Sequence, residues 1–328
     1  MAQQSLGALP SGALALPSFL STTRLPHGHY QTPGVLEPIE LLDLLELTGT
    51  TSAAAAALGM SQPTVSRRSR RLIQELSLKS RKPKALQALR YSETSCLRLL
   101  RRASQNHRLE AGTWRLGGSP LQHQLLRSKR ASGDLPLRFR HPRAWQELLR
   151  AHCLDGALVP GLDLRELLPT QADGAGAGGS GGGFTAWDDC LLMPVGSMPL
   201  GLLLPPGIAP ALSTWSEVWV PPQQDAPGLA SWVRQQQWRS VHAPRQCHRR
   251  EDWAALLLNT PKPLLCSAGW AQRLMPLLGG WAWHPCPEGA EDQTWLLVLG
   301  WIWEQHPGLE RLAQQLARSG EGFHSGDD

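Results

Sequence analysis

The chain has 328 residues, of which 41% are hydrophobic and 18% are charged, so it is long enough for about two domains with buried cores. No uninterrupted apolar run approaches the ~20 residues that span a bilayer, so we expect no integral membrane protein and no membrane partner. The chain has no Lys or Arg before Arg24 and therefore lacks the charged head of a signal peptide. Its six cysteines are scattered without a CxxC pair, which is typical of reduced thiols and predicts a cytoplasmic protein.

The net charge of +5 is unevenly distributed along the chain. Residues 61–108 contain 13 Lys and Arg residues but only two acidic residues, a net charge of +11, whereas residues 1–60 and 109–328 each sum to −3. A concentrated basic block beside a nearly neutral remainder predicts a module that binds a polyanion, attached to a second part with another role. A solvated basic face without a partner explains the charge equally well.

The N-terminal part begins with a weakly patterned segment and continues as helices. Residues 1–35 are rich in small residues, Ser and Pro without periodicity, and are interpreted as a mostly disordered extension. From Pro38 onward, leucines at helical spacing predict a helix that Gly49 ends. A short helix follows, with Ser52 as its expected cap and five alanines as its body, and Gly59 makes the next turn.

The third expected helix, residues 61–76, separates an apolar face from a basic face. Ser61 is a good N-cap, and Pro63 suits the first turn. At about 100° per residue, one sector holds Val65, Ser69, Leu72 and Leu76, and the opposite sector holds Thr64, Arg67, Arg68 and Arg71, with Gln62 at the exposed start. Because arginine pairs with phosphate or guanine and glutamine can read adenine, such a helix is suited to the major groove of DNA. The alternative is an ordinary amphipathic surface helix.

A basic stretch and a long helix are expected next. Residues 79–84 resemble a loop against phosphates, with Lys82 and Lys84 as contacts. Residues 85–110 are expected to form one helix with a thin apolar stripe, which fits a dimer seam or a linker helix. Packing of the stripe against its own domain is the alternative. The stripe consists of Leu86, Leu89, Leu97 and Leu100.

From Thr113 onward, strand-like and helical segments alternate, which predicts a sheet covered by helices. Strands are expected at Trp114–Leu116, Leu137–Phe139, Gly156–Val159, Cys190–Pro194, Leu200–Leu204, Pro263–Ser267 and Trp295–Leu299. Helices are expected at Ala144–Ala151 and Gly308–Arg318. The Gly-rich stretch 171–183 lacks the Lys-Ser or Lys-Thr ending of a phosphate-binding loop and is interpreted as a flexible insertion.

The run from Gly49 to Arg67 resembles the helix-turn-helix signature of LysR-type transcriptional regulators. It combines a small-residue second helix with Ser61-Gln62-Pro63, an apolar position at Val65, and Ser66-Arg67, and it continues through Leu72, Glu75 and Leu76. The chain departs from the family at the wing. There Ser80-Arg81 stands in place of Leu-Phe, and Tyr91–Ser95 stands in place of Leu-Thr-x-Ala-Gly.

Residues 113–320 resemble a diverged effector domain of the same family, whose fold is similar to type 2 periplasmic binding proteins. Cys153–Leu158 resembles the Leu-Asp-x-Ala-Leu segment of the family, and Asp292–Trp303 resembles its last strand and the helix that follows. The resemblance therefore implies an α plus α/β fold. Its parts are a disordered extension (1–35), a winged helix-turn-helix (36–84), a linker or dimerisation helix (85–110) and a two-subdomain effector-like domain (113–196 with 290–320, and 197–289).

The resemblance also implies a DNA-binding transcriptional regulator that acts as a homodimer or homotetramer. The implied contacts with double-stranded DNA are Ser61, Gln62, Pro63, Thr64, Ser66, Arg67, Arg68, Arg71, Lys82 and Lys84. A small-molecule effector, expected to be anionic, would lie in the cleft near Ser119, Ser197 and Ser267. Amides and a hydroxyl at a helix start can bind a carboxylate, although a simple N-cap role explains Ser119 as well.

Two other functions stay open. One is a regulator whose C-terminal half senses nothing, and the other is an enzyme on a periplasmic-binding-like fold. The pair His284 and Cys286 lacks a third metal ligand, and neighbouring arginines would repel a cation from His242, Cys247 and His248. No residue set in the sequence supports catalysis, so we expect no enzyme, no metal site and no cofactor.

Overall fold

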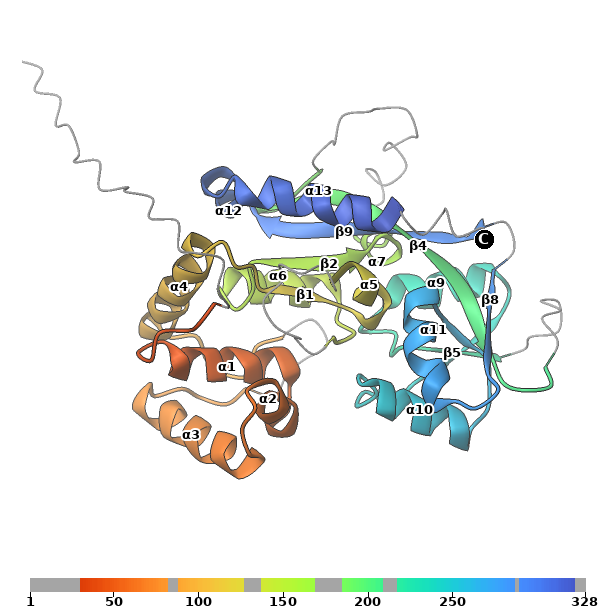
Figure 1. The fold of residues 1–328 in the computed structure, drawn as a ribbon, viewed down its shortest axis with the longest axis horizontal. Coiled ribbons are helices and arrows are strands. Elements are labelled where there is room, and N and C mark those ends of the chain that lie inside the picture. The colour runs from red at the N-terminus through yellow and green to blue at the C-terminus, as the bar shows by residue number, and fades with distance from the viewer. Residues whose placement is uncertain are drawn as a thin grey trace, which may run out of the picture.

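The computed structural model describes residues 30–81, 88–126, 137–168, 185–208, 217–286 and 289–321. Helices form the N-terminal part, and a mixed sheet with covering helices forms the rest (Figure 1). The described residues thus have the α plus α/β composition expected from the sequence. No described helix is both long enough and apolar enough to cross a membrane. The Gly-rich stretch 171–183 and residues 1–29 of the expected disordered extension lie outside the described residues.

Helices α1 (Glu37–Thr48), α2 (Thr51–Ala57) and α3 (Gln62–Glu75) pack around a small core of leucines, alanines and Val65. Gly49 ends α1 with φ +73°, a left-handed conformation that glycine adopts without strain. The cap of α2 is Thr50 and not Ser52, because the helix begins two residues earlier than expected. The Oγ1 atom of Thr50 accepts a hydrogen bond from Ala53 N at 3.1 Å.

An extended pair follows α3 and has the position of a wing. Ser80 forms an antiparallel bridge with Tyr91, and Ser92 N donates to Lys79 O at 2.8 Å. The second arm of this pair therefore lies within the range that the sequence assigned to the long helix. Lys82 and Lys84, which we expected at the phosphates, lie outside the described residues.

Helix α4 spans Ser95–Glu110, so the expectation of a helix from residue 85 is wrong for residues 88–94, which are not helical. Thr94 sets the start of the helix, because its Oγ1 accepts from Leu97 N at 3.2 Å. Residues 90–92 are instead engaged in the extended pair. A local cap and a tertiary pairing together override the helical periodicity.

The apolar stripe of α4 packs against its own chain. Leu97 is 1% exposed and lies in a core cluster with residues of α1, and Leu100 packs against that cluster. Leu89 packs in the core of the α/β part, and Leu86 lies outside the described residues. The expectation that Leu97 belongs to a dimer seam is therefore wrong. Leu99, a large hydrophobic residue of α4, is exposed, with 67% of its surface accessible.

The α/β part is built on one mixed sheet with the strand order β1-β2-β9-β4-β7-β5-β6, with β3 and β8 also pairing with β4. The strands are β1 (Leu116–Gly118), β2 (Gly156–Pro160), β3 (Thr185–Trp187), β4 (Cys190–Leu204), β5 (Glu217–Val220), β6 (Arg239–His242), β7 (Leu264–Ser267), β8 (Ala282–Pro285) and β9 (Glu291–Leu299). The covering helices are α5 (His123–Leu126), α6 (Pro142–Arg150), α7 (Gly161–Arg165), α9 (Pro227–Gln235), α10 (Arg250–Asn259), α11 (Ala268–Leu274), α12 (Gly300–Gln305) and α13 (Gly308–Glu321). Short 3-10 turns lie at Pro120–Gln122 and Met275–Leu277.

Strand β4 runs through the whole α/β part. It pairs with β9 as far as Pro199, and from Leu200 onward it pairs with β7 and β8. The two strands expected at its ends are thus one strand of 15 residues. Two hydrophobic clusters divide along it, one on Cys190–Met198 and the other on Leu200–Leu204. The α/β part therefore has two cores joined by continuous strands.

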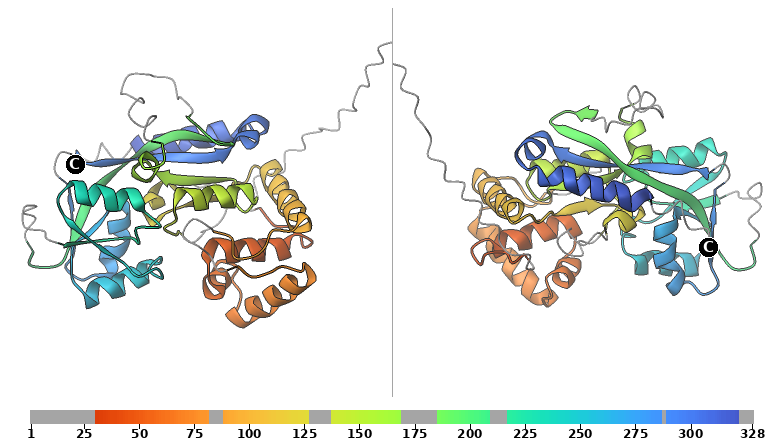
Figure 2. Two further views of the ribbon diagram at one scale, coloured as in Figure 1. Left: turned by 180° about the vertical axis from the view of Figure 1, so that it is seen from behind. Right: turned by 45° about the horizontal axis from the view of Figure 1, so that its top comes forward.

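Residues 137–139 form no strand, contrary to the sequence expectation. Arg138 N donates to Gly118 O at 3.2 Å, but the segment then turns toward the helical part. Helix α4 lies beside α1 and reaches the β1–β2 end of the sheet, whereas α3 lies at the edge of the molecule away from the sheet (Figures 1 and 2). The helix-turn-helix is thus docked against the α/β part of its own chain.

Candidate nucleic-acid interface

Helix α3 turns a polar, basic face outward at the edge of the molecule (Figure 1). Its start is fixed by Ser61, whose Oγ accepts from Thr64 N at 3.4 Å, and by Pro63 in the first turn. Val65 and Ser69 are its buried residues. The exposed side chains of α3 and its cap are Ser61, Gln62, Pro63, Arg67, Arg68, Arg70, Arg71, Gln74 and Glu75, while Thr64 and Ser66 are half-buried. The helix therefore has the two faces expected from its sequence.

Arg70 is an exposed cation that the sequence reasoning did not include. It lies on the flank of α3 opposite to Arg68, outside the sector that holds Arg67 and Arg71. The signal was present in the sequence, because at 100° per residue Arg70 also falls outside the apolar sector. The structure therefore adds one guanidinium to the candidate interface.

Gln62 is held in place by the neighbouring helix. Its Nε2 donates to the Oγ1 of Thr51 at 3.0 Å, where Gln62 is exposed and Thr51 is half-buried. Thr51 is the first residue of α2, so the bond joins the starts of the two helices of the helix-turn-helix. The amide oxygen and the second amide proton of Gln62 remain available to a base edge.

Arg71 has a local partner on the same helix. Its Nε lies 2.6 Å from the Oε1 of Glu75, four residues later, and the two side chains are 81% and 50% exposed. This ion pair restrains the guanidinium without neutralising Arg67, Arg68 or Arg70. Arg68 and Arg71 also line an open groove between α1 and α3 whose floor includes Leu41 and Leu72.

The basic block of residues 61–108 is less available to a polyanion than its charge suggests. Arg101 and Arg108 are each 1% exposed. Arg90 is half-buried, and its Nη1 donates to Gly49 O at 2.8 Å. Of the cations that are exposed among the described residues of this block, six lie on α3 or beside it at Lys79 and Arg81, and two, Arg98 and Arg102, lie on α4. The candidate interface is therefore concentrated on the helix-turn-helix.

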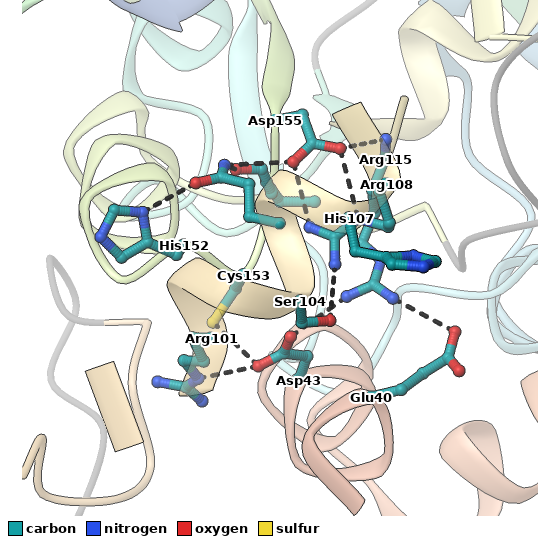
Figure 3. Close-up of polar contacts among 12 residues, drawn as sticks. Glu40, Asp43, Arg101, Ser104, His107, Arg108, Arg115, His152, Cys153 and Asp155 are labelled. Atoms are coloured by element: carbon teal, nitrogen blue, oxygen red, sulfur yellow. Dashed lines mark hydrogen bonds and ion pairs between the residues drawn. The ribbon is translucent and has the colours of Figure 1, made fainter. Parts of the chain in front are cut away.

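A buried ionic network joins α1, α4 and the α/β part (Figure 3). The carboxylate of Asp43 on α1 receives Arg101 Nε at 2.7 Å and Arg115 Nη1 at 3.1 Å. The second guanidinium nitrogen of Arg115 lies 3.2 Å from the Oε1 of Glu40. Asp43 is fully buried and has no contact with water, so these bonds stabilise its negative charge instead.

Asp155 forms the second centre of this network. Its Oδ1 receives Arg108 Nη2 at 3.0 Å and Gln105 Nε2 at 3.1 Å, and its Oδ2 receives the backbone N–H of Arg115 at 2.7 Å (Figure 3). Asp155 precedes β2, whereas Arg108 and Gln105 lie on α4. The network therefore fixes α4 to the sheet and, through Arg115, to α1.

Burial shifts the pKa values of groups around this network. Burial raises the pKa of Glu46, although Arg90 N donates to its carboxylate at 2.6 Å and Arg101 lies nearby. Burial, reinforced by Arg102 and Arg101, lowers the pKa of His152 to about 4, so this imidazole is neutral at pH 7. Its Nδ1 lies 2.8 Å from the Oε1 of Gln105.

A small cavity lies where residues of the two cores meet. It has a volume of about 10 Å³, room for about one water molecule, and is lined by Ser119, Phe139, Arg140, Asp225 and Asp292 among others. Three of the lining side chains are carboxylates, namely Asp163, Asp225 and Asp292. An anionic effector, which the sequence led us to expect, would meet these acidic groups.

The three serines expected in the cleft have structural roles. Ser119 Oγ bonds to Gln122 Oε1 and accepts from Leu121 N at 3.2 Å, and Ser267 Oγ donates to Leu121 O at 2.8 Å. Ser119 and Ser267 therefore both form hydrogen bonds with the backbone of Leu121. Ser197 lies apart from them on β4, where its Oγ donates to Gln293 Oε1 at 3.4 Å. Of the three, Ser119 lines the cavity.

A carboxylate of the chain itself closes the cleft. The Oδ1 of Asp163, on α7, accepts from Gly228 N at 2.8 Å at the start of α9. Gly228 is required there, because a Cβ would collide with the Leu162 carbonyl group. The start of α9 is therefore occupied by a carboxyl group of the chain itself, in the position where a bound carboxylate would otherwise be stabilised.

His242 and His248, which were compared above with metal ligands, lie in different surroundings. Among the described residues, no group of three or more His, Cys, Asp or Glu side chains is arranged to hold a metal ion. The imidazole of His248 is largely buried, and burial together with Arg138 and Arg140 lowers its pKa to about 3. His242 Nδ1 lies 3.1 Å from Pro221 O.

Comparisons with known proteins give structural similarities only. No family model matches the chain, and no curated protein matches it. A full-length OxyR variant from Pseudomonas aeruginosa is 14% identical with a TM-score of 0.41, over 88% of this chain and 95% of that one. An OxyR mutant from Corynebacterium glutamicum with bound hydrogen peroxide is 12% identical with a TM-score of 0.44, over 90% of this chain and 94% of that one.

A third similar structure is full-length CbnR in complex with its target DNA, at 13% identity and a TM-score of 0.42, over 87% of this chain and 99% of that one. CbnR is a LysR-family transcriptional regulator. The chain is thus similar to full-length regulators along most of its length.

Proposed function

We propose that the chain is a DNA-binding transcriptional regulator of the LysR type, in which α3 reads the major groove. The single observation that carries this proposal is the exposed face of α3, where Gln62, Arg67, Arg68, Arg70 and Arg71 project from a helix whose opposite face is core. A helix of this kind, preceded by a short helix and a tight turn, fits base and phosphate contacts. Ser61, Pro63, Thr64 and Ser66 support the helix start and the near phosphates.

We divide the chain accordingly into functional parts. Residues 36–92 form the winged helix-turn-helix, with the wing at the Ser80–Tyr91 pair, and α4 is the linker helix. Residues 113–320 form the effector-like part, with subdomains on the two cores described above. Lys82 and Lys84 belong to the proposed wing and remain candidate phosphate contacts.

Selection from a random duplex library at two salt concentrations tests the function. We expect a dyad-symmetric sequence that is retained at the higher salt concentration, because base contacts survive when counterion release weakens. Binding without sequence preference that disappears at higher salt would instead identify α3 as a general polyanion surface.

Arg67→Ala is expected to reduce affinity for the selected duplex by about 1–3 kcal/mol and to broaden preference at one base pair. Arg67 is exposed in the middle of the outward face, and its guanidinium can form a bidentate contact with guanine. Fluorescence anisotropy with the selected and scrambled duplexes measures the effect. Arg311→Ala on α13 removes an equally exposed charge at a distance from α3 and serves as the matched control. Equal losses on both duplexes would contradict base reading by Arg67.

We also propose that the chain forms a homodimer or homotetramer through the outward side of α4. Cys96, Leu99 and Ala103 are exposed at helical spacing and replace Leu97 as the candidate contact. Leu99→Asp is expected to lower the mass measured by light scattering to that of a monomer, since a charge in an apolar seam is costly. Leu258→Asp on α10, where the leucine is 58% exposed, is the control. An unchanged mass for Leu99→Asp would contradict this seam.

A specific observation favours a second candidate, a regulator that senses no small molecule. The cleft cavity holds about one water, and Asp163 already occupies the start of α9. We therefore expect no change in Tm when the full chain is mixed with an excess of amino acids or aromatic carboxylates. A ligand at about 100 times its Kd would add about 2.7 kcal/mol to the free energy of unfolding. The corresponding rise in Tm would contradict this second candidate and support a regulator that binds a small molecule.

A further inference from the structure

The last turn of α1 is capped by arginines from a distant part of the chain. Arg140 Nη2 donates to the carbonyl oxygens of Glu46 and Leu47 at 2.7 Å and 2.6 Å, and Arg138 Nη1 donates to Thr48 O at 2.7 Å. Helix α1 has no basic residue in its own last turn. The negative end of its dipole and its free carbonyl groups are therefore satisfied by residues about 90 positions later.

These arginines meet α1 where the helix-turn-helix begins. A Cβ at Gly49 would collide with the guanidinium of Arg138, so the turn and the arginine fit tightly together. Thr48 Oγ1 donates to Thr50 O at 3.0 Å, and Thr50 caps α2. The next residue, Thr51, holds Gln62 at the start of α3. Continuous contacts thus lead from Arg138 and Arg140 to a side chain proposed to read DNA.

The segment that carries the two arginines also lines the cavity between the two cores. Phe139 and Arg140 line the cleft cavity together with Asp225, which precedes α9 in the second core. Arg140 is 8% exposed, and its Nε has no hydrogen-bond partner among the described residues. Its positive charge is therefore balanced by carboxylates at a distance, chiefly Glu46 on the helical side and Asp225 on the cleft side.

We propose that residues 137–141 couple the cleft to the helix-turn-helix, with Arg138 and Arg140 as positioning residues. Loss of the Asp225 carboxylate removes a negative charge near half-buried Arg138 and buried Arg140, so repulsion between their guanidinium groups weakens their hydrogen bonds to the end of α1. The turn at Gly49 and the bond between Thr51 and Gln62 then lose their support. The effect on DNA affinity rests on the proposed function, whereas the mechanical link itself does not.

Hydrogen exchange on the full chain tests the link directly. Asp225→Asn is expected to speed amide exchange of residues 49–57 by about fivefold or more, the lower end of typical coupling between sites. Glu251→Gln removes one negative charge from an exposed position in the same half and is expected to leave that exchange unchanged. DNA affinity of Asp225→Asn is expected to fall by a similar factor, while Glu251→Gln retains it.

A double-mutant cycle makes the assignment specific. In an Arg138→Gln background, Asp225→Asn is expected to add little to the exchange rate, because the link is already broken. Arg140→Gln provides the same test and, because Arg140 is buried, is used only if the variant folds. Unchanged exchange in Asp225→Asn, or fully additive effects with Arg138→Gln, would overturn the proposal. If the protein selects no duplex sequence, the proposed function fails, but the exchange measurement still decides the coupling.

Discussion

Replacing Asp43 with alanine is expected to lower the free energy of unfolding by about 3–5 kcal/mol, as is typical when one member of a buried charge cluster is removed. Asp43 is fully buried and binds both Arg101 and Arg115, which are themselves 1% and 3% exposed. Its loss leaves two guanidinium groups without their shared carboxylate and opens a cavity beside Cys153. Urea unfolding of the full chain measures the change.

Glu75→Ala is the control for Asp43→Ala, because it also removes a carboxylate paired with arginine from the helical part. The Arg71–Glu75 pair is largely exposed, so its removal is expected to cost less than about 1 kcal/mol. If the two variants lose the same small amount, the buried network does not hold the helical part to the sheet.

Asp292→Asn is expected to remove a fall in stability that the wild type undergoes as the pH rises from 5 to 8. Burial raises the pKa of Asp292 to about 7, against 3.8 for an ordinary aspartate. Its Oδ1 accepts from Leu162 N at 2.9 Å, while its Oδ2 has no hydrogen-bond partner among the described residues. Asparagine can keep the first bond and cannot ionise, so the variant retains the geometry without the charge.

The sign follows from proton binding. Between pH 4 and 7 the folded protein keeps the Asp292 proton and the unfolded chain does not, so the free energy of unfolding falls as the pH rises through this range. From pH 5 to 8 this group alone accounts for about 2–3 kcal/mol. The charge of Asp292 also helps raise the pKa of buried Asp163, so the variant relieves both carboxyls.

Urea unfolding of wild type and Asp292→Asn at pH 5 and pH 8 checks this prediction. His152 has a lowered pKa and acts in the opposite direction, but it contributes equally to both proteins and cancels in their difference. Asp189→Asn is the control, because Asp189 is exposed and paired with Arg150. Parallel pH dependence in wild type and Asp292→Asn would show that Asp292 is ionised in the folded protein at pH 5.

The sequence predicted those features that depend on near neighbours. Ser61 as the cap of α3, Gly49 as the end of α1, and the buried face at Val65 each follow from local rules about caps, turns and periodicity. Two helix starts were predicted wrongly because more than one nearby residue can begin a helix. Helix α4 is capped by Thr94 and does not begin at Ala85, and α2 is capped by Thr50 and not by Ser52. Such choices are decided by tertiary pairing.

The sequence did not predict which charges would be buried. Arg101 has the same local surroundings as Arg102, but Asp43, 58 residues away, draws it into the interior while Arg102 stays exposed. Residues 137–139 alternate like a strand, yet Arg138 and Arg140 cap α1 instead. Periodicity carries no information on pairings at this separation. The hydrogen bond between Gly228 and Asp163 could not be predicted for the same reason, because the two residues are 65 positions apart.

The network around Asp43 and Asp155 has an evolutionary consequence. Two of its ion pairs cross the boundary between the helical part and the sheet, namely Asp43 with Arg115 and Arg108 with Asp155. In a chimera joined near residue 112, the two members of each of these pairs would therefore come from different parents. Natural variants of this chain are therefore expected to change Asp43, Arg101 and Arg115 together. Transplanting the helix-turn-helix onto another regulator would require grafting its arginine partners as well.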